Sequence, residues 1–145
     1  MRTAFILTLA LAACTSPTGA PVKRATLRPV SAATFELVPE TGQLPFCLAY
    51  TVSPKGVIRQ LTMSAENASL ECPAGQPIGQ HVFRVPPSEP SVRVLVLFTS
   101  QSVNATSVSS QLIDTPRAAS LTAMDLRLPG QAALELIDFT PEGGP

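Results

Sequence analysis

The chain is poor in the residues on which most enzymes and nucleic-acid-binding proteins depend. Among its 145 residues there is no tryptophan, one tyrosine and one histidine, and ten basic residues balance ten acidic ones. A chain with no net charge and no extended basic patch is not expected to bind nucleic acid. A carboxylate pair for glycoside hydrolysis would also need aromatic stacking surface for the sugar, which this composition hardly supplies.

Catalytic motifs are equally scarce. A Ser-His-Asp hydrolase would have to use His81, with Asp114, Asp125 or Asp138 as its partner, and no Gly-x-Ser-x-Gly elbow selects a serine nucleophile. Glycine loops that cradle phosphate and acidic calcium-binding loops are missing as well. We therefore expect no catalytic residues, no metal and no cofactor, so that the chain is not an enzyme. A hydrolase that uses His81 is the less favoured alternative.

The first fourteen residues have the features of a bacterial export signal. Arg2 precedes a ten-residue apolar run, about half the roughly 20 residues that a membrane-spanning helix needs. The run ends in Leu11-Ala12-Ala13-Cys14, which resembles the lipobox of bacterial lipoproteins. An ordinary cleaved signal without lipid, or a buried N-terminal element, would be the alternative.

The lipoprotein resemblance implies where the protein is held. Residues 1–13 would be the signal peptide, and Cys14 would be lipidated and become the first residue of the mature chain. The membrane would then be bound through this N-terminal lipid. Because Thr15 rather than aspartate follows the cysteine, the family pattern implies the outer membrane, with the protein facing the periplasm.

Apart from Cys14, two cysteines remain, and they predict a disulfide. An even number of cysteines in an exported chain indicates a bridge, because the periplasm is oxidising. A bond between Cys47 and Cys72 would close a loop of about 25 residues and stabilise the fold by roughly 3.5 kcal/mol. A zinc site would need more ligands than these two sulfurs and His81. A Cys-His nucleophile pair would lack a residue to orient the imidazole.

Proline content and hydrophobic patterning predict an all-β fold. Fifteen prolines are spread along the chain, which favours short strands over long helices. We predict a single antiparallel β-sandwich or open barrel with at most one short helix; a mixed α+β fold is the alternative. The domain would span residues 32–140, between a flexible tether over 14–31 and a disordered tail over 141–145.

Individual elements follow from apolar runs and the turn residues between them. Strands are expected at residues 34–38, 46–52, 57–63, 81–85, 91–99, 120–128 and 132–139, and a short helix at 106–113 with Thr106 as its N-cap. A type I turn over residues 53–56 would join the second and third strands. The run 91–99 is the most apolar and is expected to be a central strand covered on both faces. Residues 64–80 are expected to form a loop.

Residues 46–100 also resemble a small β-domain of unknown function found in bacterial envelope and signalling proteins. The likeness rests on the strand–turn–strand of residues 46–61, the loop Pro73-Ala74-Gly75, and the short strand 81–85 leading into the apolar strand 92–98. The cysteine pair is not part of that pattern. The resemblance implies a module that contacts a partner and has no known catalytic residues.

These observations favour a non-enzymatic accessory module of the cell envelope that binds a protein partner. A neutral, tethered β-domain offers mainly its surface, and an exposed edge strand such as residues 81–85 would provide binding by strand addition. A small-ligand carrier with a cavity between its sheets is the alternative from another class.

Overall fold

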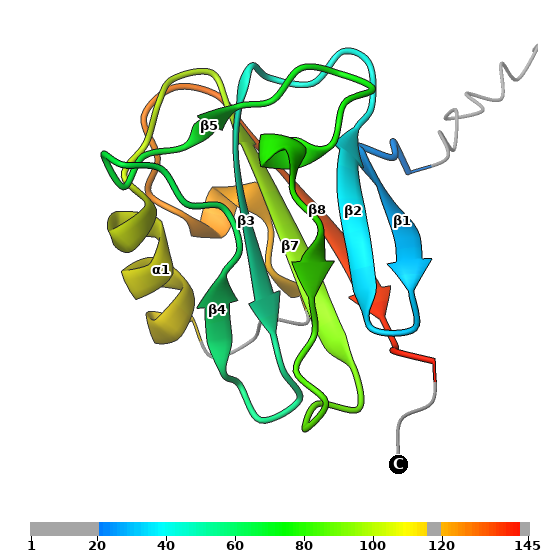
Figure 1. Cartoon of the computed structure of the whole chain (residues 1–145). Coiled ribbons are helices and arrows are strands. Elements are labelled where there is room, and N and C mark those ends of the chain that lie inside the picture. The colour runs from blue at the N-terminus through cyan, green and yellow to red at the C-terminus, as the bar shows by residue number, and fades with distance from the viewer. Residues whose placement is uncertain (1–20, 116–119, 143–145) are drawn as a thin grey trace, which may run out of the picture.

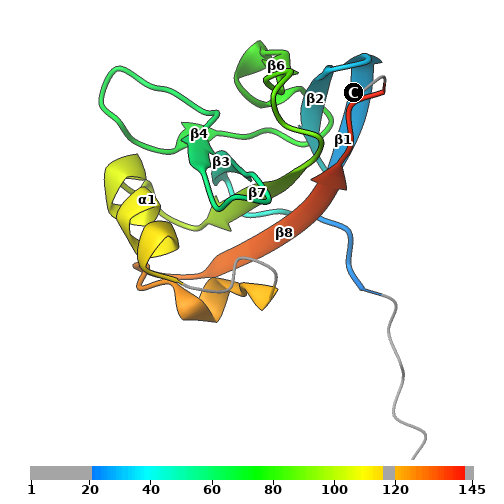
Figure 2. The same cartoon turned by 90° about the horizontal axis from the view of Figure 1, so that it is seen from below.

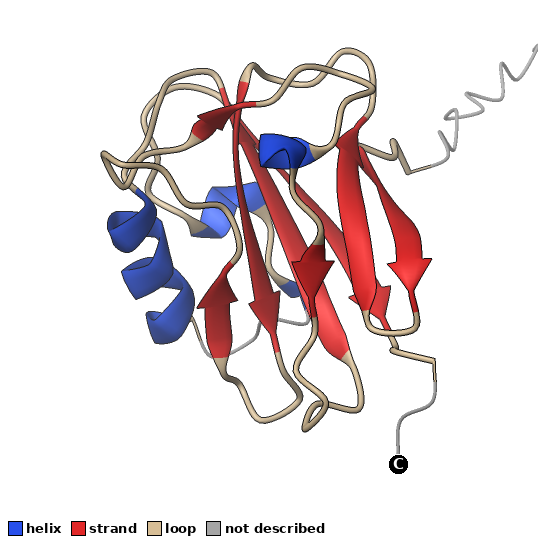
Figure 3. Ribbon diagram, viewed as in Figure 1, coloured by secondary structure: helices blue, strands red, loops and turns tan. Residues whose placement is uncertain are grey.

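Two antiparallel sheets make up most of the domain, as the computed structural model shows for residues 21–115 and 120–142 (Figures 1 and 3). The smaller sheet has the order β1 (Ala25–Ser31), β2 (Thr34–Pro39), β6 (Phe83–Arg84). The larger sheet has the order β4 (Ile58–Gln60), β3 (Phe46–Val52), β7 (Val92–Thr99), β8 (Ala132–Phe139), and β5 (Leu70–Glu71) also pairs with β3. The predicted all-β sandwich is confirmed.

The chain folds this way because its apolar residues alternate along the strands. Phe35 lies between the sheets, where its ring centroid is 5.9 Å from that of Phe83 and 4.9 Å from that of Phe139. This first core holds buried residues of both sheets: Ala25, Phe35, Leu37, Cys47, Ala49, Cys72, Ile78, Phe83, Val85, Val92, Val94, Val96, Phe98 and Phe139. It joins the two sheets into one sandwich.

A second core covers the other face of the larger sheet (Figure 2). Helix α1 (Ala105–Asp114) and the chain around residues 121–126 pack there against the even-numbered residues of β3 and the odd-numbered residues of β7. Its buried members are Leu48, Tyr50, Val52, Leu95, Leu97, Val103, Ala105, Val108, Leu112, Leu121 and Leu126. Strand β7 therefore contributes side chains to both cores, as predicted for residues 91–99.

Two local predictions near the helix are wrong. Helix α1 begins at Ala105, two residues earlier than a Thr106 cap would give. Its N-cap is Asn104, whose side chain accepts a hydrogen bond from the Ser107 N–H at 3.0 Å. Residues 120–128, predicted as a strand, contain no strand; the 3-10 helix η3 (Ala123–Asp125) lies there instead. The Asp125 carboxylate accepts hydrogen bonds from the backbone N–H and the hydroxyl of Thr122, which closes a turn where an extended strand was expected.

The boundary of the tether also differs from the prediction. Residues 25–31 were assigned to the tether but form β1, which pairs with β2 from Ala25↔Pro39 to Ser31↔Thr34. The opposite charges of Arg28 and Glu36 lie across the strand pair, 3.3 Å apart. The folded domain therefore begins near Ala25. The predicted signal peptide, Cys14 and residues 143–145 of the predicted tail lie outside the described residues.

The central turn and loop are largely as expected. The Gly56 N–H donates a hydrogen bond to the Ser53 carbonyl at 2.9 Å, which closes the predicted turn between β3 and β4. Gly56 has a φ of 78°, a conformation that favours glycine. The predicted loop 64–80 contains the short strand β5 and the 3-10 helix η1 (Ile78–Gln80). Nowhere in residues 21–115 and 120–142 is a helix long and apolar enough to cross a membrane.

Candidate partner-binding surface

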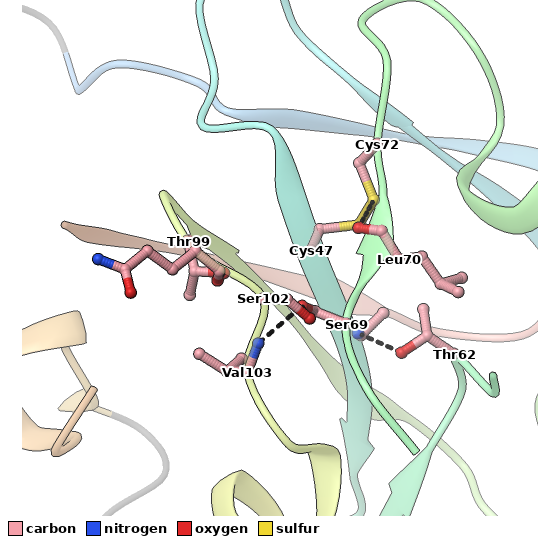
Figure 4. The surroundings of a disulfide bond; sticks show 10 residues. Cys47, Thr62, Ser69, Leu70, Cys72, Thr99, Ser102 and Val103 are labelled. Atoms are coloured by element: carbon pink, nitrogen blue, oxygen red, sulfur yellow. Dashed lines mark hydrogen bonds between the residues drawn. A yellow bond between two sulfur atoms is a disulfide. The ribbon is translucent and has the colours of Figure 1, made fainter. Parts of the chain in front are cut away.

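The predicted cysteine pair lies at disulfide distance within the first core (Figure 4). Cys47 is on β3 and Cys72 directly follows β5, with 5.8 Å between their Cα atoms. The Cys72 N–H also donates to the Pro45 carbonyl at 2.9 Å, so the segment after β5 is held to β3 by backbone as well. Both cysteines are buried. Buried sulfurs of this kind hold a fold together, whereas reactive thiols are accessible.

Two buried hydroxyl groups accept backbone hydrogen bonds in the same region. The Thr62 hydroxyl accepts a hydrogen bond from the Ala49 N–H at 3.1 Å, and the Ser69 hydroxyl accepts one from the Val103 N–H at 3.0 Å (Figure 4). These side chains satisfy backbone donors that the short strands β4 and β5 leave without a ladder partner. The hydroxyls near the cysteine pair therefore complete the backbone hydrogen bonding of the fold.

His81 is exposed and follows η1 directly. Among the described residues, no hydrogen bond or ion pair joins its imidazole to a serine or to any of the three aspartates considered as its partners. Asp125 is bonded to Thr122 and Asp138 to Arg93, while Asp114 ends α1. The part of the chain that the structure describes also holds no group of three or more His, Cys, Asp or Glu side chains suited to a metal ion.

The strand expected to offer an edge at residues 81–85 is short. Of residues 81–85, Phe83 and Arg84 form the strand β6, which pairs with β2. The longest strand at an edge is instead β8, the eight-residue outer strand of the larger sheet. Its residues 132–137 are all half-buried, so they remain partly accessible. The surface most suited to pairing with another chain is therefore at β8.

Strand β8 lies beside β1, the outer strand of the smaller sheet, and the arrows of the two strands point in the same direction in Figure 1. At one end the Arg24 N–H donates to the Glu135 carboxylate at 3.1 Å, and at the other the Glu142 N–H donates to the Ala32 carbonyl at 2.8 Å. No ladder in the described residues pairs β1 with β8 between these points. We call this gap, between residues 24–32 and 135–142, the β1–β8 seam.

Two open depressions lie along the seam. One, of about 550 Å³, is lined by residues between 21 and 27 and by residues 135–138. The other, of about 500 Å³, is lined by residues between 27 and 32 and between 138 and 142. Leu27 and Asp138 line both, so the depressions adjoin. Leu27 and Ile137 pack against the first core, which makes the floor of the seam apolar.

A third depression, also about 550 Å³, lies at the end of the larger sheet and includes Ser53, Ser91, Arg93, Asp138 and Thr140 in its lining. The Arg93 guanidinium binds Asp138 through two bonds, Nε to Oδ1 at 2.7 Å and Nη2 to Oδ2 at 3.0 Å. These hydrogen bonds hold the pKa of Asp138 below its usual range and raise the pKa of Arg93. The pair fixes both charges at the end of the seam. All three depressions open to solvent.

No family model matches this chain, and neither a curated protein nor a solved structure matches it. The resemblances to bacterial lipoproteins and to the small envelope β-domain therefore stay predictions. The site that sequence reasoning missed is the β8 edge. The signal for it was Glu135, a carboxylate on the side of β8 that is otherwise apolar and faces the first core, because inward charges are typical of edge strands.

Proposed function

We propose that this chain is a lipid-anchored protein of the bacterial cell envelope whose β-domain binds a protein partner and performs no catalysis. The anchor is inferred from the lipobox-like motif ending at Cys14, with the outer membrane, facing the periplasm, as its place. The binding role is inferred from the domain.

The observation that carries the binding role is the outer edge of β8, along which no strand of the described residues forms a ladder. An eight-residue strand at the edge of a sheet presents a row of backbone N–H and C=O groups that can pair with another chain. Protein domains bind extended segments in this way, with main-chain hydrogen bonds for affinity and side-chain pockets for specificity. The two depressions beside β8 supply such pockets.

The position of β1 limits where the partner lies. Ten residues, 15–24, separate Cys14 from the first strand. Even when fully extended, a segment of this length spans at most about 35 Å. A lipid at Cys14 would therefore keep the domain close to the membrane surface. The partner would be a protein of that membrane or of the adjacent envelope.

Replacing the lipidation site tests the anchor. We expect Cys14→Ala to leave the protein unprocessed or unlipidated, so that it moves out of the membrane fraction and its intact mass lacks the acyl groups. Thr15→Ser is the matched control and should keep the wild-type mass and location. Membrane retention and an unchanged mass in Cys14→Ala would refute the anchor.

Crosslinking in intact cells tests the binding role. A photoreactive residue at exposed Thr140, at the end of β8, should yield a discrete crosslinked envelope protein. The same probe at Met63, which is 77% exposed and follows β4 at the opposite edge, should not. Recovery of only lipid or cell-wall glycan at Thr140 would contradict a protein partner.

A further inference from the structure

The larger sheet has a second outer strand, β4, at the edge opposite β8. The Leu61 N–H donates to the Ala49 carbonyl at 2.8 Å, next to the register pair Tyr50↔Gln60. Because bonded and non-bonded pairs alternate in an antiparallel ladder, the odd-numbered residues of β4 bond to β3. The N–H and C=O groups of Ile58 and Gln60 therefore point away from β3, and no other strand of the described residues pairs with them.

An edge of this kind can pair with the same edge of a second copy of the chain. All three residues of β4 are half-buried, so the strand remains partly accessible. Two antiparallel β4 strands related by a two-fold axis would join two larger sheets into one, and such two-fold contacts are the commonest way in which identical chains associate. Proteins usually carry a feature that prevents this pairing at an accessible edge.

The middle residue of β4 carries a positive charge on the inner side of the sheet. Arg59 pairs with Thr51 of β3, and residues that are directly opposite in a ladder lie on the same face. Thr51 shares its face with Cys47 and Ala49, which belong to the first core. The Arg59 side chain therefore lies on the face that looks toward the smaller sheet, where it remains 40% exposed.

A buried carboxylate holds this guanidinium in place. The Arg59 Nη1 donates to Oε1 of Glu89, which lies in the segment between β6 and β7. The Glu89 side chain is only 9% exposed, and the Glu89 N–H donates to the Pro86 carbonyl at 3.0 Å. The other carboxylate oxygen, Oε2, is buried and has no hydrogen-bond partner within residues 21–115 and 120–142. Movement of Arg59 away from Glu89 would leave a buried charge without its ion pair, which strongly destabilises a fold.

Pairing of two β4 strands would bring two such charges together. With Ile58 of one copy bonded to Gln60 of the other, the two Arg59 residues would lie directly opposite each other. They would form a non-bonded pair, in which the Cα atoms are only about 4.5 Å apart, and like charges at this position are destabilising. Strand β8 also carries an inward charge, Glu135, but there the Arg24 N–H binds the carboxylate within the chain.

We infer that Arg59, fixed by the buried carboxylate of Glu89, prevents two copies of this chain from joining their larger sheets through β4. The pair keeps a positive charge at the centre of the only backbone register that uses all the outward groups of Ile58 and Gln60. The inference goes beyond the proposed function, because it concerns the opposite edge of the sheet and a second copy of the chain rather than the envelope partner.

Removing both charges tests the inference. We combine Arg59→Met with Glu89→Leu, because apolar replacement of a whole buried pair leaves no unpaired charge and generally keeps a fold stable. Sedimentation of the whole chain in density-matched detergent should show a dimer whose dissociation constant is about tenfold or more below that of the wild-type chain. The matched control makes the same two changes in the exposed pair of β1 and β2, Arg28→Met with Glu36→Leu, and should sediment like the wild-type chain.

Two further readouts show whether the charge acts at the edge of β4. Arg59→Lys keeps an inward positive charge and should remain monomeric, a rescue that a purely structural role of Arg59 would not give. In hydrogen exchange, the amides of Ile58 and Gln60 should exchange rapidly in the wild-type chain at every protein concentration. In the variant that lacks both Arg59 and Glu89 they should become protected as the concentration rises.

Three results would overturn the inference. The first is a doubly substituted chain that stays monomeric, and the second is one that associates without protection of the Ile58 and Gln60 amides. The third is protection of these amides in the wild-type chain that rises with its concentration, a result that needs no variant to fold.

The photoreactive probe at Met63 distinguishes this inference from the proposed function. In cells, the chain that lacks Arg59 and Glu89 should give a crosslink from Met63 to a second copy, whereas the wild-type chain should give none. If Thr140 captures no envelope protein while the doubly substituted chain dimerises through β4, the proposed function fails and this inference stands. If Thr140 captures its partner and the doubly substituted chain stays monomeric, the proposed function stands and this inference fails.

Discussion

Removing the link between Cys47 and Cys72 should cost a large part of the stability of the domain. The pair closes a loop with a sequence separation of 25 residues that contains β4 and β5. A crosslink over a loop of this length lowers the entropy of the unfolded chain by an amount worth about 3.5 kcal/mol at 25 °C. Small domains unfold with about 5–15 kcal/mol in total. We therefore expect Cys47→Ala combined with Cys72→Ala to fold only marginally.

Urea unfolding followed by circular dichroism measures the loss. The oxidised wild-type chain is compared with the double variant and with the wild-type chain reduced by dithiothreitol. The reduced chain keeps both sulfur atoms, so its difference from the oxidised chain isolates the crosslink from the packing of the side chains. The dependence on urea should become steeper without the crosslink, because the unfolded chain then exposes more surface.

Two outcomes would refute this reasoning. If oxidised and reduced chains unfold within about 1 kcal/mol of each other, the loop does not act through the unfolded state as the entropy argument requires. If peptide mapping of protein isolated from the envelope finds both thiols free, the pair is not oxidised in the cell, and the compartment inferred from the sequence is in doubt.

Two other predictions concern single residues. Tyr50 is fully buried, its hydroxyl donates to the Ala105 carbonyl at 3.0 Å, and burial raises its pKa to about 12. Folding thus favours the protonated phenol, so stability should hold below pH 10, the pKa of an unfolded tyrosine, and fall between pH 10 and about pH 12. Tyr50→Phe should lose about 1 kcal/mol at neutral pH and should lack the alkaline fall; urea unfolding across this pH range checks both. Gly130 has a φ of +70°, and a Cβ there would lie 2.5 Å from the Ser100 Oγ. Gly130→Ala should therefore lower the melting temperature more than Gly42→Ala, which has a φ of +84° and open space; equal losses would show that backbone strain alone acts.

Much of the sheet was predictable because its strands are apolar or alternate over their whole length. The residues of β2, β3, β7 and β8 follow this rule, and their positions agree with the predicted ranges to within a residue or so. Strand β1 was missed because Arg28 and Pro29 give it the appearance of a linker. Its strand character comes from pairing with β2, which a local pattern does not contain.

The opposite error occurred at residues 120–128. Leu121, Ala123 and the other apolar residues there suggested a strand, whereas a local hydrogen bond from Thr122 to Asp125 produced a turn. The cysteine pair could be predicted from an even count alone. The β8 edge was missed although Glu135 was a signal for it, because a strand is at an edge only by virtue of the order of all strands in its sheet.

The burial of β7 on both faces has a consequence for how the protein is made. The strand is buried from Val94 to Thr99 and pairs residue for residue with β8, which lies near the end of the chain. Strand β7 is apolar apart from Arg93. Until β8 has been synthesised, β7 lacks the neighbouring strand with which it pairs on that side. Such segments aggregate when they are exposed during folding. A chain that ends before Ala132 should accordingly be recovered as aggregate, because it lacks the strand that covers this side of β7.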